Sequence, residues 1–237
     1  MKVNAATLSN LEGINMLNSE QKMGYINSII AERSSKQYEN LENAGTMLKI
    51  SEQFLQAAEI VATNASNVYL KHPMMPNVSI LVFGRNTKHY FGVMLETEII
   101  TDSGVVVNVP QILSERRFCL KMGGSASHYG VVSCRGFVVS SLAADEKEAF
   151  GKGQIRMEEA IISIKKYGCI RPLRGADSPE KDFECHHDGY QFDLRRDNLK
   201  WVSHEDHRDI HKETSQKSHN RVMTVYPNCP IPAFVAK

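Results

Sequence analysis

The chain has 237 residues, of which 42% are hydrophobic and 23% are charged, a composition typical of folded globular proteins and unlike that of collagen-like or wholly disordered chains. The 28 basic and 27 acidic side chains leave a formal net charge of +1, so no global positive field attracts nucleic acid or an acidic membrane surface. Binding of either kind must therefore come from a local patch.

The cysteines and the apolar segments indicate a reducing compartment. The five cysteines are odd in number and far apart, which argues against a disulfide framework and against a four-cysteine zinc ribbon. No segment resembles a signal peptide or approaches the length of a membrane span. We expect a cytoplasmic protein without a membrane partner.

The first 70 residues are predicted to be helical. Ser19 and Ser51 can each cap a segment whose apolar residues recur at three- and four-residue spacing. These amphipathic faces need buried partners, in this chain or in a second copy, so a homodimer through the N-terminal helices is one expectation. The apolar positions are Met23, Ile26 and Ile30 in the first helix and Phe54, Ala58 and Val61 in the second.

From about residue 78 to 140 the pattern changes to one typical of strands. The segments are rich in β-branched and aromatic residues, and Asp102-Ser103-Gly104 is typical of a hairpin turn. We expect an antiparallel sheet in which residues 121–127 form a loop, and Arg116-Arg117 is interpreted as edge-strand charge, with a nucleic-acid contact as the alternative. The predicted strands are Val78–Phe83, Tyr90–Leu95, Glu98–Thr101, Val105–Val109, Arg117–Leu120 and Tyr129–Ser140.

A third helix is predicted over residues 153–167, with Gly168 as its C-terminal stop. Pro172, Gly175 and Pro179 then form a short linker. The expected organisation is a helical region over 1–72, an antiparallel β region with a helix over 73–170, and a separate module with an irregular tail over 171–237.

Six of the nine histidines fall between His186 and His219. Within this segment, residues 183–187 and 198–202 are predicted to form two strands joined by a polar loop. Ser203 can cap a helix that follows them, with Asp206 in the position of a capping box. The local pattern is therefore strand, loop, strand, helix.

His207 and His211 are four residues apart, so on a helix their imidazoles lie on one face, a spacing at which two nitrogens can share a metal ion. A strand that ends at His186 can bring a third imidazole to that ion, which leaves open positions as in catalytic sites. On a regular strand His187 lies on the opposite side and stays free to act as a base.

These residues resemble the HNH, or ββα-metal, nucleases, and most closely the nuclease domains of colicin- and pyocin-type DNase toxins. The resemblance rests on three pieces, Glu184-Cys185-His186-His187-Asp188, Asp197-Asn198-Leu199-Lys200 and His207-Arg208-Asp209-Ile210-His211. It covers about 30 residues, and residues 1–180 resemble nothing we recognise. The loop between His187 and Asn198 is shorter than in the toxins and lacks their paired glycines, as in phage and homing HNH proteins.

The resemblance implies a role for each matching residue. His186, His207 and His211 would bind one divalent metal ion, His187 would be the general base, Asn198 would hold the loop that orients it, and Glu184 would support the site. Three imidazoles favour Zn²⁺, Ni²⁺ or Co²⁺ in tight binding, while Mg²⁺ or Mn²⁺ can be the working ion.

The expected fold is thus α+β, with N-terminal helices, a central antiparallel sheet and a C-terminal ββα-metal module. The expected function is metal-dependent hydrolysis of DNA to 5′-phosphate and 3′-hydroxyl ends, in a bacterial or phage context. Two alternatives stay open: a sequence-specific homing or restriction endonuclease of phage type, and a non-catalytic, metal-stapled nucleic-acid-binding protein.

Overall fold

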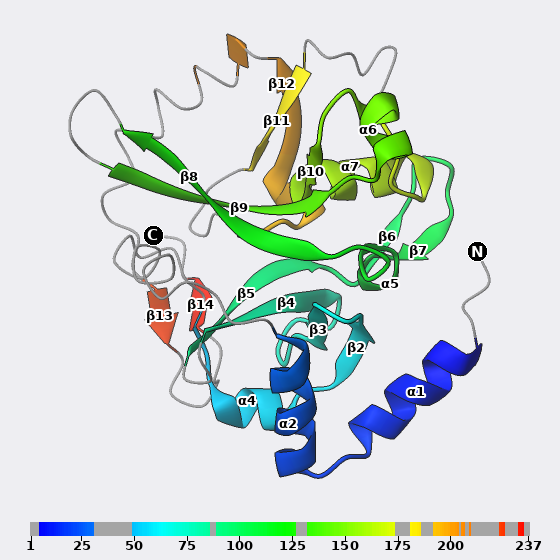
Figure 1. Ribbon diagram of the computed structural model, residues 1–237, viewed down its shortest axis with the longest axis vertical. Helices are drawn as coiled ribbons and strands as arrows, with labels where there is room; N and C mark the ends of the chain where they lie inside the picture. The colour runs from blue at the N-terminus through cyan, green and yellow to red at the C-terminus, as the bar shows by residue number, and fades with distance from the viewer. Residues whose placement is uncertain are drawn as a thin grey trace.

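The computed structural model describes residues 5–30, 49–85, 89–126, 132–173, 181–185, 192–203, 205–206, 209, 223–225 and 232–234. Helices and antiparallel sheets are both present in these residues, so the protein has the mixed α+β character expected from the sequence (Figure 1). The ββα-metal module within that class stays a prediction.

The larger sheet has five strands in the order β1-β5-β4-β3-β2, and all neighbours are antiparallel. β4 and β5 pair without a break from Val78↔Glu96 to Arg85↔His89. Consecutive residues of β4 are buried, because the sheet has other parts of the protein on both faces. The strands are β1 (Lys49–Ile50), β2 (Ile60–Thr63), β3 (Val68–Lys71), β4 (Val78–Arg85) and β5 (His89–Glu96).

β2 and β3 show that the prediction of helix throughout the first 70 residues is wrong. The reason is a turn built by Asn64, whose side-chain oxygen accepts the backbone N–H groups of Ser66 and Asn67 at 2.8 and 2.9 Å. Such an Asx turn reverses the chain and allows the β-branched residues on either side to pair as a hairpin. Val61, expected on a helix face, lies in β2.

In the part of the chain that the structure describes, three helices precede or interrupt this sheet: α1 (Ala5–Asn15), α2 (Ser19–Ile29) and α4 (Glu52–Ala57). Ser51 caps α4 as predicted, because its hydroxyl accepts the N–H of Phe54 at 3.2 Å. The cap of α2 is one residue earlier than predicted. Asn18 accepts the N–H of Gln21, and the Gln21 side chain accepts the N–H of Asn18, which completes a capping box.

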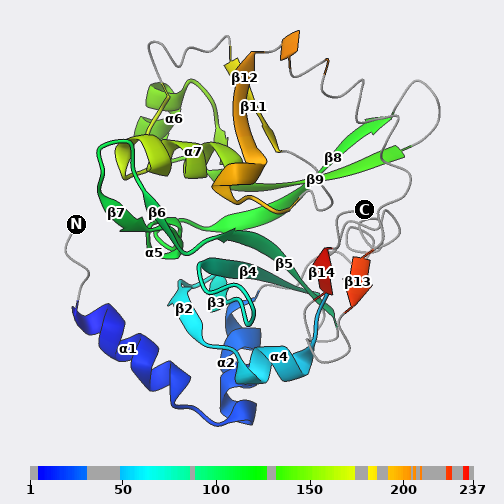
Figure 2. The same cartoon turned by 180° about the vertical axis from the view of Figure 1, so that it is seen from behind.

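α2 and α4 cover one side of the five-stranded sheet (Figures 1 and 2). Ile26, Phe54 and Leu55 are all buried in the same hydrophobic core as the strands. The amphipathic faces that motivated a homodimer therefore find their partners within this chain.

A smaller sheet has the order β10-β9-β8, formed by β8 (Phe118–Ala126), β9 (Val132–Ser141) and β10 (Gln154–Arg156). The predicted loop at residues 121–127 is wrong for 121–126, which continue β8. The glycines of this segment do not end the strand, because its register with β9 continues from Phe118↔Ser140 to Ala126↔Val132.

A hairpin of β6 (Glu98–Ile100) and β7 (Val106–Asn108) contains the predicted turn. Gly104 has φ +83°, a conformation that favours glycine, and its N–H donates to the Thr101 carbonyl at 2.8 Å. β7 leads into α5 (Val109–Leu113), a short helix that was not predicted. Val109, predicted as the last residue of a strand, is the first residue of this helix.

α6 (Ala144–Phe150) and α7 (Met157–Tyr167) flank the smaller sheet. The predicted helix over 153–167 begins later than expected, because Gln154–Arg156 pair with β9 as β10. Its predicted end is confirmed, since Gly168 has φ +72° and its N–H donates to the Ile164 carbonyl at 2.7 Å.

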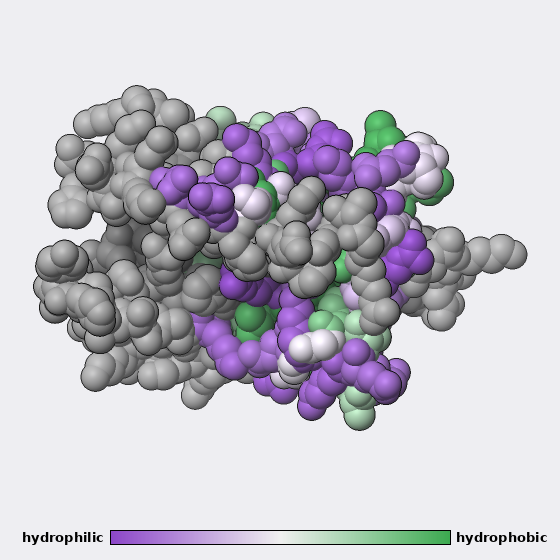
Figure 3. All heavy atoms as spheres, turned by 90° about the horizontal axis from the view of Figure 1, so that it is seen from above, coloured by the Kyte–Doolittle hydropathy of each residue, from purple (hydrophilic) through white to green (hydrophobic). Residues whose placement is uncertain are grey.

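The two sheets share one hydrophobic core, which contains residues of β3, β4, β5, β8, β9 and α7. The side of the molecule away from α2 and α4 is mostly hydrophilic where it is described (Figure 3). Among the described residues, no helix is long and apolar enough to cross a bilayer.

Towards the C-terminus the described residues include two further strand pairs, β11 (Lys181–Cys185) with β12 (Leu199–Ser203), and β13 (Met223–Val225) with β14 (Pro232–Phe234). The tail of the C-terminal module, expected to be irregular, contains the strand β14. Its proline is the first residue of the strand, a position where the missing N–H is tolerated.

Candidate functional site

The candidate site is built on the β11–β12 pair, which lies beside α7 (Figure 1). The register runs from Lys181↔Ser203 to Cys185↔Leu199. β11 begins two residues before the predicted start at 183, and β12 is shifted by one residue from the predicted range of 198–202, but their antiparallel pairing is as expected. Residues 192–198, which precede β12, are the described part of the predicted loop.

Asn198 closes the described end of this loop. It is the last residue of the 3₁₀ turn η2 (Arg196–Asn198), and its backbone N–H donates to the Arg195 carbonyl at 2.8 Å. Its side-chain Nδ2 donates to the Asp193 carbonyl at 2.6 Å. The amide therefore ties the loop to the start of β12, the kind of contact that a loop-holding residue makes.

The loop is fastened to β5 by a short parallel bridge. The Met94 N–H donates to the Phe192 carbonyl at 2.9 Å, and the Leu194 N–H donates to the Met94 carbonyl at 2.8 Å. Phe192 and Leu194 are 2% and 1% exposed, and the Phe192 ring lies 6.0 Å from that of Phe91. The position of the loop before β12 is thus set by the core of the larger sheet.

Two arginines of the loop are paired with carboxylates. Arg195 makes a two-pronged contact with Asp193, with Nε–Oδ1 at 2.8 Å and Nη2–Oδ2 at 2.6 Å, and this contact raises the pKa of the guanidinium. The Arg196 N–H donates to Glu96 at 2.9 Å, and its guanidinium lies 3.5 Å from the same carboxylate. Both side chains serve to fix the loop on the body of the protein.

His72 is a buried residue near Arg195 of the loop, and its hydrogen bonds are satisfied. It is 4% exposed, and its Nδ1 accepts the N–H groups of Met74 and Met75 at 3.1 and 3.0 Å. Burial, with a contribution from nearby Arg195, lowers the pKa of His72 to about 4, so the ring is neutral near neutral pH. Met75 in turn contacts Arg195.

Ser203 forms the predicted cap of the following helix. Its hydroxyl accepts the N–H of Asp206 at 3.1 Å and donates to the Asp206 carboxylate at 2.7 Å. Glu205, Asp206 and Asp209 are helical. The described residues thus follow the order strand, loop, strand, helix.

The histidines themselves lie outside the described residues. This applies to His186, His187, His207 and His211, and Glu184 is described only as a backbone position, opposite Lys200 in the register. Among the described residues, no group of three His, Cys, Asp or Glu side chains could hold a metal ion. This finding does not apply to the predicted ligands His186, His207 and His211, because they lie outside the described residues.

The sequence analysis did not identify the two residues that anchor the loop, Phe192 and Leu194, or the β5 carboxylate that pairs with Arg196. Phe192 and Leu194 alternate with polar neighbours, a pattern of period two that indicates a half-buried extended segment. That alternation could have identified them as core residues. Glu96, the partner of Arg196, carries no comparable sequence pattern.

Comparisons with models of protein families, with curated proteins and with solved structures found no match for this chain.

Proposed function

We propose that the protein is a metal-dependent DNA endonuclease of the HNH type. The observation that carries the proposal is the arrangement around Asn198. A paired strand ends next to His186, a loop is closed by the Asn198 amide, and a helix is started by Ser203. This is the order of elements that the resemblance requires at these positions.

The donor set suits a divalent ion. Three neutral imidazoles, from His186, His207 and His211, form a set typical of transition-metal sites that keep positions open. His207 and His211 are four residues apart in the sequence, the spacing of about one helical turn, and the described helical residues Glu205, Asp206 and Asp209 belong to the same short segment. When bound, the ion would polarise the scissile phosphate and stabilise the leaving 3′ oxygen.

The chain's own groups would manage the proton and the geometry. His187 would take the proton from the attacking water, because a neutral imidazole has a pKa near the working pH. Asn198 would keep the loop in place through its bond to the Asp193 carbonyl, and the buried anchors Phe192 and Leu194 would fix that loop on β5. The products would carry 5′-phosphate and 3′-hydroxyl ends.

One observation favours a sequence-specific endonuclease of homing or restriction type. The loop of the candidate site packs into the same core as the five-stranded sheet, so any DNA contact made by that body would be held in a fixed position relative to the site. A specific enzyme gives discrete fragments from a plasmid, whereas a non-specific one gives a smear.

The test is cleavage of supercoiled plasmid by wild type and by His187→Ala, each with Mg²⁺, Mn²⁺, Zn²⁺, Ni²⁺, Co²⁺ or EDTA. We expect cutting by wild type with metal only, and loss of cutting in the variant with unchanged metal content. His219→Ala is the matched control, because His219 lies outside the quoted motif and should leave cutting unchanged.

A wild-type protein that retains metal but cuts neither DNA nor RNA under these conditions would overturn the proposal. It would then favour the non-catalytic, metal-stapled nucleic-acid-binding protein. Cutting by His187→Ala at the wild-type rate would remove His187 as the base.

A further inference from the structure

The β8–β9 pair continues well beyond the sheet to which it belongs. β10 pairs with β9 only at Val139–Ser141, whereas β8 and β9 stay paired as far as Ala126↔Val132. From Lys121 outward, the described chain provides no third strand on either edge. Figures 1 and 2 show this two-stranded ribbon extending away from α6 and α7.

The root of the ribbon is fixed in the core. Phe118, Leu120 and Val138 are 0%, 4% and 1% exposed. Asn67 also binds both backbone groups of Phe118, donating to its carbonyl at 2.9 Å and accepting its N–H at 2.9 Å. The inner end of the ribbon is therefore fixed on the body of the protein.

The ribbon has a charge pattern unlike that of the whole chain. No aspartate or glutamate occurs from residue 116 to residue 144, although the protein has 27 of them among 237 residues. The same stretch contains Arg117, Lys121 and Arg135 beyond the ion-paired Arg116. Lys121 is exposed, and its ammonium donates at 2.6 Å to the neutral Gln154 amide, so its charge is not cancelled by that contact.

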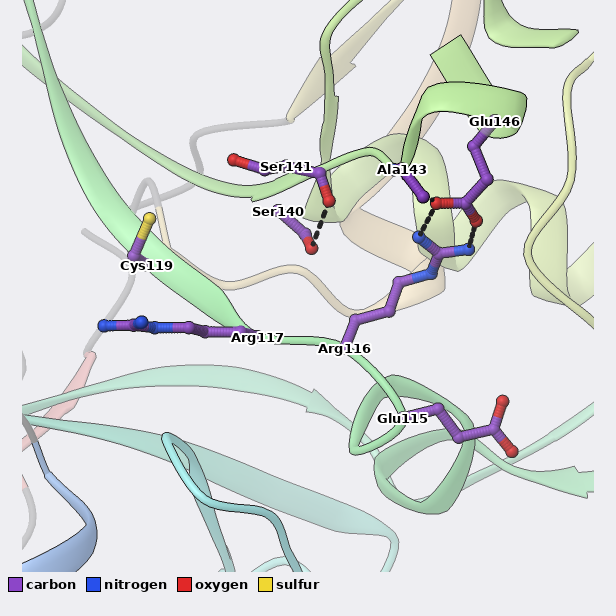
Figure 4. A pocket seen from close by; sticks show the side chains of 8 residues that line it. All are labelled: Glu115, Arg116, Arg117, Cys119, Ser140, Ser141, Ala143 and Glu146. Atoms are coloured by element: carbon purple, nitrogen blue, oxygen red, sulfur yellow. Dashed lines mark hydrogen bonds and ion pairs between the residues drawn. The ribbon is translucent and has the colours of Figure 1, made fainter.

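A pocket of about 420 Å³ lies at the ribbon's root (Figure 4). One of its arginines, Arg116, makes a two-pronged ion pair with Glu146, which holds the pKa of that carboxyl below its usual range. The other, Arg117, is exposed, and its guanidinium points away from this pair along β8. Arg117 has no carboxylate partner among the described residues, while Glu115 extends in another direction.

The ribbon also contains several glycines. Gly123, Gly124 and Gly136 lie in its paired part, and Ser125 and Ala126 follow the first two along β8. The major groove of B-form DNA is about 12 Å wide and admits a two-stranded β-ribbon, and small side chains ease that approach. The major groove of duplex RNA is deep and narrow and does not admit one.

We infer that the β8–β9 ribbon is a DNA-binding arm that enters the groove of duplex DNA, with Lys121 on the ribbon and Arg117 at its root contacting phosphates. This inference rests on the proposed function for its partner, DNA. It assigns the contact to a part of the chain remote in sequence from the histidine motif. The cationic arm explains how a protein of net charge +1 can bind a polyanion through a local patch.

The test is the affinity of the full-length protein for a short fluorescein-labelled DNA duplex in EDTA, measured by anisotropy over a range of salt concentrations. The variant is Arg117→Gln/Lys121→Gln. We expect roughly a tenfold or greater loss of affinity and a salt dependence shallower by about one unit of slope per lost phosphate contact. Because this readout needs no cleavage, its failure is distinguishable from failure of the endonuclease proposal.

A matched control removes the same charge elsewhere. Lys147→Gln/Lys165→Gln changes two lysines outside the ribbon and should bind DNA as wild type does. Arg117→Lys keeps the charge at the root of the ribbon and should also retain affinity, with the fold of each variant checked by circular dichroism.

Equal losses of affinity in the ribbon variant and the control would overturn the inference, because net charge alone would then explain binding. Wild-type affinity for duplex RNA equal to that for DNA would overturn it as well. Loss confined to the ribbon variant supports it.

Discussion

Asn198 shows how much a single amide can contribute to the candidate site. Its Nδ2 bonds to a backbone carbonyl that belongs to the same loop, so the side chain fixes the path of the chain into β12. The Asp193 carboxylate, which accepts from Arg195, has no hydrogen to donate to this carbonyl. The loop therefore depends on a donor at position 198.

We expect Asn198→Ala to lower plasmid cleavage by roughly tenfold to a hundredfold, since small displacements of a reacting group can cost that much. Stability should fall by only about 1 kcal/mol, the usual contribution of one hydrogen bond. Rates and urea unfolding measure the two effects. Asn77→Ala is the control, because Asn77 also donates to a backbone carbonyl, that of Glu98, and should leave cleavage unchanged.

His72 should make the protein sensitive to acid. Its pKa is about 4 in the folded protein and near 6.5 when unfolded, so the unfolded chain binds the proton more tightly. The free energy of unfolding is therefore highest above about pH 6.5, and it falls by up to about 3 kcal/mol as the pH falls towards 4.

His72→Asn should remove this dependence. An asparagine oxygen can accept the same two backbone N–H groups but does not titrate in this range. Urea unfolding of both proteins near pH 7 and near pH 4.5 is the measurement, within the window set by the two pKa values. Equal acid sensitivity in the two proteins would show that His72 is not its source.

At the scale of elements, the helix after β12 depends on its cap. The Ser203 hydroxyl accepts a hydrogen bond from the backbone N–H of Asp206 and donates one to the Asp206 carboxylate. The segment it starts is the one that carries His207 and His211 in the sequence. Helix formation and metal binding should therefore be coupled.

Ser203→Ala should cost about 1 kcal/mol of helix stability and weaken Ni²⁺ or Zn²⁺ binding by up to about tenfold, as expected for loss of an N-cap. Calorimetric titration with the metal measures this. Ser203→Thr retains the hydroxyl and should retain the affinity. Identical affinities in the alanine and threonine variants would contradict the coupling.

At the scale of the whole molecule, the candidate site is joined to a sheet that lies about a hundred residues earlier in the chain. Phe192 and Leu194 bury their side chains in the common core, and their backbone groups bond to Met94. Arg196 and Glu96 add an ion pair at the same place. The body of the protein therefore positions the site as well as supporting it.

Leu194→Ala should lower the free energy of unfolding by about 2 to 5 kcal/mol, the range for deleting a fully buried leucine side chain. It should also reduce plasmid cleavage at temperatures where the protein remains folded, because the loop loses its anchor. Thermal and urea unfolding, with cleavage assays, measure the two effects. Met16→Ala, at a residue 87% exposed, should change neither.

The sequence by itself determined the features that depend on residues a few positions apart. The caps by Ser51 and Ser203, the turn at Asp102–Gly104 and the stop at Gly168 all use contacts within about one turn of chain, so local pattern suffices to find them. The β11–β12 pairing was also foreseen, because a short polar loop separates two strand-like segments.

Only the tertiary structure decided the features whose partners are distant. β8 continues through its glycines because β9 pairs with it, and Ile60–Thr63 is a strand because the Asn64 turn brings β3 beside it. The Phe192–Leu194 anchor exists because Met94 offers a free edge, and no local pattern records which edge is free. Local hydrogen bonds are specified by neighbouring residues, whereas sheet pairing and burial depend on the partner that the whole fold provides.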